Sequence, residues 1–303
     1  MKKIAALVLF LFCISRSLCQ DYTSASFYLV AHQDQWQLFM GIDAYNDIAV
    51  GPPGKVIFIY TTAGDESCRG AALDTSYYLA RQEGANNSVE FCADKSTTLG
   101  GMGSLWDTTY VTISDHSILK YTYKNVVSYC LRLPDGCFGS GLFGQSLQYL
   151  HNHPATHINA VDGSAVYSGW NDLVNTVQQI INNERAGIPD VWLKTADTDT
   201  AYNPGDHPDH IYTALLGLDA IAPLYYINEA LYQEYNTSGL PVNLSNADIA
   251  TESALLSILD YGRTSNSRSS EWSSLKVSFT SRNYFRVIAG RQPPIPNTIL
   301  VEY

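Results

Sequence analysis

Beyond its first twenty residues, the chain has no apolar run long enough to span a bilayer, which takes about 20 consecutive apolar residues. Basic residues are also scarce, since 18 Lys and Arg stand against 29 Asp and Glu, for a formal net charge of −11. Nucleic acids and anionic lipids attract cationic surfaces, so a chain this acidic is a poor partner for either. We therefore expect no membrane span and no nucleic-acid partner, and uncharged substrates fit better.

The first nineteen residues have the pattern of a secretory signal peptide. Lys2 and Lys3 precede a short apolar stretch, and Ser17 and Cys19 are small residues just before a cleavage site at Gln20. Cleavage there would remove three cations and no acid, which changes the net charge from −11 to −14. The pattern predicts export.

A lipoprotein acylated at Cys19 is the weaker alternative. Arg16 and Leu18 occupy positions where such sites usually carry small residues. We therefore expect a periplasmic or extracellular protein. Its mature chain, residues 20–303, has no visible repeat or low-complexity linker, which predicts a single domain with a C-terminal extension.

Cysteine is rare, and cleavage would leave four of the six: Cys68, Cys92, Cys130 and Cys137. The chain has no C-x-x-C pair, which argues against a cysteine metal site. An even number of cysteines in an oxidising compartment indicates two disulfides. Of the three possible pairings we favour Cys68–Cys92 with Cys130–Cys137, because both loops are then short.

Strand and helix patterns alternate along the chain, which predicts an α/β fold with a mostly parallel sheet. Strands are expected at 26–32, 55–62, 190–197 and within 108–134, and helices at 74–89, 170–187, 207–222 and 245–262. Ser245 or Asn246 should cap the last helix and Gly262 should end it. Residues 274–290 resemble strands or edge structure, which makes an additional C-terminal β or irregular segment.

Two His/Asp clusters follow predicted buried strands. His32 and Asp34 come directly after the first strand, and His207, Asp209 and His210 come after the strand at 190–197. The carboxyl ends of parallel strands meet at one edge of a sheet, and residues three apart share a helix face. A catalytic zinc site needs three protein ligands and one open position. Either cluster alone is more often structural, but the two together indicate a metal site. Further acids at the same predicted edge are Asp65, Asp197 and Asp199.

The motifs in this order resemble the PIG-L/LmbE-like family of metal-dependent N-acetylglucosamine de-N-acetylases. The family's first motif, [A/P]-H-P-D-D-E, stands here as AHQDQW over residues 31–36. Its T-x-G turn corresponds to YTTAGDES, its Arg–Glu helix to Arg81 and Glu83, and its closing H-x-D-H to GDHPDH. The resemblance covers residue 26 to about residue 225 and leaves roughly the last quarter uncovered.

The resemblance implies a Rossmann-like fold and a divalent metal, usually zinc, with His32 and His210 among its ligands. The family's third ligand is the second Asp of the first motif, and here that position is Gln35. An amide oxygen binds zinc more weakly than a carboxylate, so metal affinity should fall. Gln33 and Trp36 also depart from the motif, and neither is expected to touch the metal.

The resemblance also implies the catalytic roles. Asp34 would be the general base, and His207 the group on the oxyanion side, with Asp209 as its orienting carboxylate or as a partner outside the metal ligands. Asp65 and Arg81 are expected at the substrate. Asp34 or Asp65 could instead replace the lost metal ligand, and the sequence does not decide this.

The implied activity is removal of the N-acetyl group from an N-acetylglucosamine-type sugar or glycoconjugate, by attack of a metal-activated water on the acetamide carbonyl. A catalytically impaired glycan-binding relative is the alternative, because of Gln35. A purely structural exported domain, in which the histidines make only local hydrogen bonds, is disfavoured by the two converging clusters.

Overall fold

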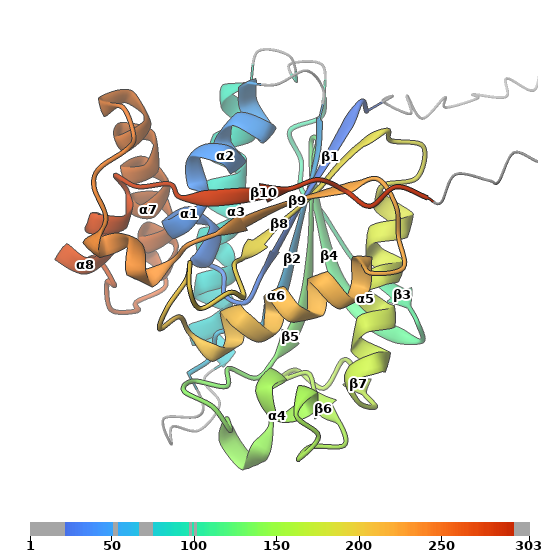
Figure 1. The fold of residues 1–303 in the computed structure, drawn as a ribbon. Coiled ribbons are helices and arrows are strands. Elements are labelled where there is room, and N and C mark those ends of the chain that lie inside the picture. Colours follow the sequence, from blue (N-terminus) through green and yellow to red (C-terminus); the bar gives the residue numbers. More distant parts are fainter. Residues whose placement is uncertain (1–21, 51–53, 67–74, 97–98, 100–101, 294–303) are drawn as a thin grey trace, which may run out of the picture.

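The computed structural model describes residues 22–50, 54–66, 75–96, 99 and 102–293 (Figure 1). The predicted signal peptide, residues 1–19, lies outside this range. The strands of the main sheet are β1 (Ser24–Val30), β2 (Gly54–Thr62), β3 (Asp107–Ile113), β4 (His116–Tyr123), β5 (Val126–Leu133), β8 (Asp190–Ala196), β9 (Ile227–Tyr232) and β10 (Phe285–Ile288). They lie in the order β10-β9-β8-β1-β2-β5-β4-β3. A separate small sheet pairs β6 (Ile158–Asn159) with β7 (Val166–Tyr167).

The five strands in the middle of the sheet run parallel, in the order β9-β8-β1-β2-β5. Antiparallel strands flank them, with β10 on one side and β4 and β3 on the other. The mostly parallel α/β sheet expected from the sequence is therefore confirmed. From β1 the chain builds outward to β2 and β5, and later to β8 and β9 on the opposite side. Ligands bind at such a switch point, beyond the carboxyl ends of the strands.

Helices cover both faces of the sheet, and Figure 1 shows α5 and α6 on one face and α1, α2, α3 and α7 toward the other. The helices are α1 (Gln35–Phe39), α2 (Gly41–Tyr45), the π-helix η1 (Asn46–Val50), α3 (Thr75–Lys95), the 3₁₀ turn η3 (Leu142–Gly144), α4 (Leu147–His151), α5 (Trp170–Glu184), α6 (Pro208–Ile221), the 3₁₀ turn η4 (Tyr235–Gly239), α7 (Asn246–Ser265) and α8 (Ser274–Phe279). None of the described helices has the length and apolarity needed to cross a membrane.

Strand β1 is apolar on both sides because both of its faces are covered. Phe27 and Leu29 pack into the core that contains the buried residues of α5 and α6. Tyr28 and Val30 alternate with them and pack into the core on the side of α1, α3 and α7. Successive side chains of a strand point to opposite faces. In a strand between two helical layers both faces are buried, so apolar residues are favoured at every position.

The C-terminal segment differs in part from its prediction. Residues 274–279 form the helix α8 rather than a strand, because the Ser273 hydroxyl caps it by accepting a hydrogen bond from the backbone N–H of Lys276. Residues 285–288 form the edge strand β10, as the pattern indicated.

Helix α7 begins as predicted and ends later than predicted. Ser245 is its N-cap, in a capping box with Asp248. The helix passes through Gly262 and continues to Ser265. A Cβ atom at Gly262 would lie 2.3 Å from the Cα of Gly84 in α3. This glycine therefore serves the close approach of two helices and does not end one.

Both favoured disulfides are wrong. Cys92 on α3 and Cys130 on β5 are free thiols, and both are buried in the core on the α3 side of the sheet. One member of each predicted pair is thus a core side chain with no disulfide partner. Cys68 lies outside the described residues.

Candidate functional site

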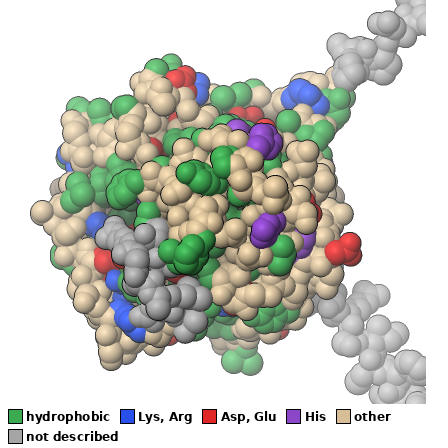
Figure 2. All heavy atoms as spheres, turned by 90° about the horizontal axis from the view of Figure 1, so that it is seen from below, with side chains coloured by type: hydrophobic (Ala, Val, Ile, Leu, Met, Phe, Trp, Pro, Cys, Tyr) green, Lys and Arg blue, Asp and Glu red, His purple; other side chains and the backbone are tan. Residues whose placement is uncertain are grey.

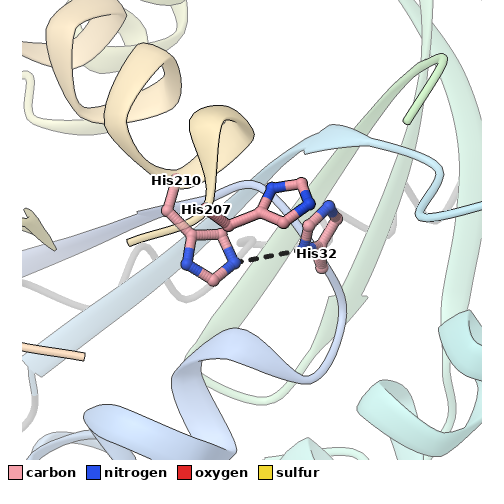
Figure 3. Close-up of side chains that lie close together, drawn as sticks. All are labelled: His32, His207 and His210. Carbon is pink, nitrogen blue, oxygen red and sulfur yellow. Dashed lines mark hydrogen bonds between the residues drawn. The ribbon is translucent and has the colours of Figure 1, made fainter. Parts of the chain in front are cut away.

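Three histidines meet beyond the carboxyl ends of β1 and β8. His32 follows β1, while His207 and His210 stand at the start of α6, and Figure 3 shows the three rings close together. The ring centres are 5.0 Å apart for His32 and His207, 5.0 Å for His32 and His210, and 5.3 Å for His207 and His210. Nδ1 of His32 lies 3.1 Å from Nε2 of His210. The structure brings together the two predicted metal-binding histidines.

His32 is surrounded so that it stays neutral. Burial lowers its pKa to about 4, against the opposing effect of the Asp135 carboxylate. Its Nε2 lies 3.4 Å from Oδ2 of Asp209 and 3.7 Å from Oδ2 of Asp135. A neutral imidazole whose far nitrogen faces a carboxylate is the usual form of a metal-binding histidine.

His210 is surrounded by negative charge on its other side. Its Nδ1 lies 3.0 Å from Oδ1 of Asp206 and 2.5 Å from Oε2 of Glu234. Burial alone would lower the pKa of His210, but the two carboxylates raise it well above the usual value. The metal-free protein therefore carries a protonated His210, and metal binding would release the proton from Nε2.

His207 caps the helix that carries His210. Its Nδ1 accepts a hydrogen bond of 3.1 Å from the backbone N–H of Asp209, at the first turn of α6. Burial, and then the neighbouring His32 and His210, lower the pKa of His207 to about 4, so the ring is neutral. Because Nδ1 is an acceptor, the single ring proton is on Nε2. His207 lines the cavity described below and can donate a hydrogen bond there.

Asp34 is an ionised carboxylate held between two cations. Nη2 of Arg81 lies 2.5 Å from its Oδ1, and Nζ of Lys276 lies 2.8 Å from its Oδ2. Burial would raise the pKa of Asp34, but Arg81 and then Lys276 hold it well below the usual value. Lys276 also pairs with Glu271. The predicted base is therefore anchored partly by α8, in the quarter of the chain that the resemblance does not cover.

Of the two roles expected for Asp209, its position fits that of a partner outside the metal ligands, because its carboxylate lies beside His32 and not at the ring of His207. Asp209 is fully buried, and its Oδ2 accepts a 2.8 Å hydrogen bond from the backbone N–H of Gly136. That carboxylate lies beside His32, whereas only the backbone N–H of Asp209 reaches His207. Burial, and then the charge of Asp135, raise the pKa of Asp209 to about 7.

Two further predicted site residues make hydrogen bonds that differ from their predicted roles, and Oδ2 of Asp65 has no hydrogen-bond partner among the described residues. The Gln35 amide oxygen accepts a hydrogen bond from the backbone N–H of Ala31, and its amide nitrogen donates to Oε1 of Glu234. Gln35 would have to give up one of these bonds to bind a metal. Oδ1 of Asp65 accepts a 2.8 Å hydrogen bond from the backbone N–H of Asp135, and Asp65 does not line the cavity. It holds the loop after β5.

A cavity of about 390 Å³ opens beside the histidines. It is lined by His32, Asp34, Glu66, Arg81, Asp135, Cys137, Phe138, Gly205, Asp206, His207, Tyr235, Glu271 and Lys276. Figure 2 views the molecule from below Figure 1, where the loop between β5 and α4 lies, and hydrophobic side chains are exposed there together with histidines. Phe138 and Phe143 of that loop are 84% and 92% exposed. The volume is within the range of small-molecule sites.

Several site residues were not found from the sequence. Asp135 follows β5 and Glu234 follows β9, so the rule that polar residues gather at the carboxyl ends of parallel strands could have found both. Lys276 and Glu271 carry no local signal, because they reach the cavity only through the packing of α8. Asp197 is buried in a bidentate pair with Arg286 and ties β10 to the sheet.

The side chains present fit a divalent metal. Two zinc ligands at about 2.0–2.1 Å in tetrahedral geometry would be about 3.3 Å apart, and the facing nitrogens of His32 and His210 are 3.1 Å apart. Each of the two rings has carboxylates at its other nitrogen, as metal-binding histidines commonly do. Two groups of side chains have one nitrogen or oxygen atom from each member within 4.8 Å of the others in the group. The groups are His32, His207 and His210, and His32, Asp135 and Asp209.

No protein-family model matches the chain, and no curated protein matches it. Among solved structures, it is similar to a deacetylase in the biosynthesis pathway of teicoplanin, with 15% identity over 79% of this chain and 83% of that chain and a TM-score of 0.43. It is similar to N,N'-diacetylchitobiose deacetylase from Pyrococcus horikoshii, with 14% identity over 80% and 71% of the two chains and a TM-score of 0.42. The A40926 pseudoaglycone deacetylase Dbv21 has 14% identity over 82% and 84%, with a TM-score of 0.42. At these values the similarity does not by itself assign an activity.

Proposed function

We propose that this protein is a metal-dependent hydrolase that removes the acetyl group from an N-acetylglucosamine-type sugar or glycoconjugate. The observation that carries the proposal is the facing pair of His32 Nδ1 and His210 Nε2, at a cavity that Asp34 and His207 also line. A divalent metal such as zinc, held by these two histidines, would polarise the acetamide carbonyl and make a water more acidic.

The residues of the chain supply the remaining chemistry. Asp34, kept ionised by Arg81 and Lys276, accepts the proton of the attacking water and passes it to the leaving amine. The Nε2–H of His207 donates to the oxygen of the acetamide as negative charge develops on it. Arg81 and Lys276 fix the position of the Asp34 carboxylate in the cavity. In this proposal the neutral His207 is the hydrogen-bond donor to the carbonyl oxygen, and the ionised Asp34 is the proton acceptor for the water.

We further propose that the mature protein is exported after cleavage before Gln20. The signal-peptide pattern of residues 1–19 supports this. Export fits a substrate of polysaccharide or glycoconjugate type, and an acidic protein would suit an uncharged member of that class.

Acetate release tests the proposed activity. Mature protein with excess zinc is incubated with N-acetylglucosamine and with short chitooligosaccharides, beside His210→Ala and a control, His157→Ala, which changes an exposed histidine outside the cavity. We expect zinc-dependent release that is abolished in His210→Ala and kept in His157→Ala. Glycan binding without acetate release would instead support the glycan-binding alternative, and release that survives in His210→Ala would overturn the assigned site.

A further inference from the structure

Gln35 joins the ends of two strands through its side chain. It begins α1 and is 1% exposed. Its amide oxygen accepts a 2.5 Å hydrogen bond from the backbone N–H of Ala31, just after β1, and its amide nitrogen donates at 2.7 Å to Oε1 of Glu234, just after β9. A carboxamide can accept and donate at once, which an ionised carboxylate cannot. An acid at position 35 would set a negative oxygen against Glu234.

Glu234 carries this contact on to His210. Its carboxylate is fully buried, with Oε2 at 2.5 Å from Nδ1 of His210. Asp206 reaches the same nitrogen at 3.0 Å through Oδ1, while its Oδ2 accepts a 2.7 Å hydrogen bond from the amide of Asn203. Each of the two carboxylates is thus held by a carboxamide at one oxygen and faces His210 with the other. The far side of the ring is fixed by paired amides and acids.

This arrangement sets which nitrogen of His210 is available to a metal. Two carboxylates face Nδ1 and accept hydrogen bonds from it, while Nε2 points at Nδ1 of His32. A carboxylate at the far nitrogen of a metal-binding imidazole fixes its tautomer and strengthens it as a ligand.

We propose that Gln35 is a positioning residue and not a metal ligand: Gln35, Glu234 and His210 form a hydrogen-bonded relay that directs Nε2 of His210 toward His32. The inference rests on the proposed metal-dependent function. It assigns the amide at position 35 a task of its own, which is to hold Glu234 against His210. It also assigns a role to Glu234, which lies beyond the stretch that carries the motifs.

A ligand role and a relay role predict opposite effects of Gln35→Asp. If residue 35 binds the metal, an aspartate adds an anionic ligand and zinc affinity rises. If residue 35 holds Glu234, an aspartate removes the donor and brings two buried negative charges together, so zinc affinity falls. Zinc affinity of the mature protein, measured by competition with a chelator, separates the two.

The same measurement is made on Gln35→Met and Glu234→Gln, which keep side-chain size. We expect zinc affinity to fall ten- to a hundredfold in both, as is typical when the partner of a metal ligand is removed. Gln37→Met is the matched control, because Gln37 lies on the same helix, is fully buried, and has an amide with no hydrogen-bond partner among the described residues. Its zinc affinity should stay within twofold of the unaltered protein.

A readout on metal-free protein separates failure of the relay from failure of the proposed function. The ¹⁵N signals of the His210 ring should shift in Gln35→Met and Glu234→Gln and stay in place in Gln37→Met. Tighter zinc binding in Gln35→Asp would overturn the relay, and so would unchanged His210 signals in both relay variants. If the unaltered protein binds no zinc while the His210 signals respond as expected, the relay stands and the metal-dependent function fails.

Discussion

Nζ of Lys276 lies 2.8 Å from Oδ2 of Asp34, which joins the C-terminal helix α8 to a carboxylate 242 residues earlier in the chain. Arg81 holds the other oxygen of the same carboxylate. The segment that no motif covered therefore contributes, with Arg81, to the charge environment of the predicted general base.

Lys276→Met should shift the pH dependence of activity. Asp34 is buried, which raises its pKa, yet Arg81 and Lys276 bring the pKa well below its usual value. Removal of one cation raises the pKa of Asp34, so the acidic limb of the kcat/KM profile should move to higher pH. Lys276→Arg, which keeps the cation, should leave the limb in place. A limb that does not move in Lys276→Met would show that Asp34 does not govern it.

Asp34→Asn should separate catalysis from metal binding. A positioned general base contributes about 10²- to 10⁴-fold to the rate, so kcat for acetate release should fall by that factor. Zinc affinity should stay within a few-fold, because the facing nitrogens belong to His32 and His210. Parallel acetate and chelator-competition assays check this. Equal loss of both properties would assign Asp34 to the metal instead.

Glu184→Gln should reduce stability near neutral pH and leave it unchanged in acid. Burial disfavours ionised Glu184, but hydrogen bonds from Lys55 and Tyr129 keep its pKa below its ordinary value of 4.5. Lys120 Nζ lies 3.2 Å from the same carboxylate. A depressed pKa contributes stability above about pH 4.5, and this stability is lost as the pH falls through the native value.

The loss in Glu184→Gln should be about 1–3 kcal/mol of unfolding free energy at pH 7, and it should shrink toward zero below the native pKa of Glu184. Urea unfolding at pH 7 and at pH 3 measures both. Glu83→Gln, which changes an exposed acid, should match the unaltered protein at each pH. A loss in Glu184→Gln of the same size at both pH values would exclude the ion pairs as its cause.

Gly262→Ala should destabilise the packing of α7 on α3. A Cβ there would lie 2.3 Å from the Cα of Gly84, so the two helices must separate, at about 1–3 kcal/mol for overpacking. Gly239→Ala is the control, since its Cβ would have no neighbour within 4 Å. Thermal unfolding of both variants compares them. A melting temperature for Gly262→Ala equal to that of Gly239→Ala would show that the helices adjust without cost.

The sequence pattern predicted those helices and strands whose formation depends on neighbouring residues. The buried strands β1, β2 and β8 show as continuous apolar runs, and the capping box at Ser245 fixes where α7 begins. Gly262 misled because a glycine that allows two helices to touch has the same local sequence as one that ends a helix. The disulfide predictions for Cys92 and Cys130 were wrong because they relied on the short sequence separation within each pair. That separation does not show that each cysteine is buried in the core, one on α3 and one on β5.

By itself the sequence determined the α/β alternation and the gathering of His32, His207 and His210 at one edge, because the carboxyl ends of parallel strands must meet there. Only the tertiary structure decided which groups surround those histidines. Glu234 reaches His210 through the pairing of β9 with β8, and Lys276 reaches Asp34 through the docking of α8. Such contacts depend on the packing of distant segments, which has no signature in the sequence around either partner.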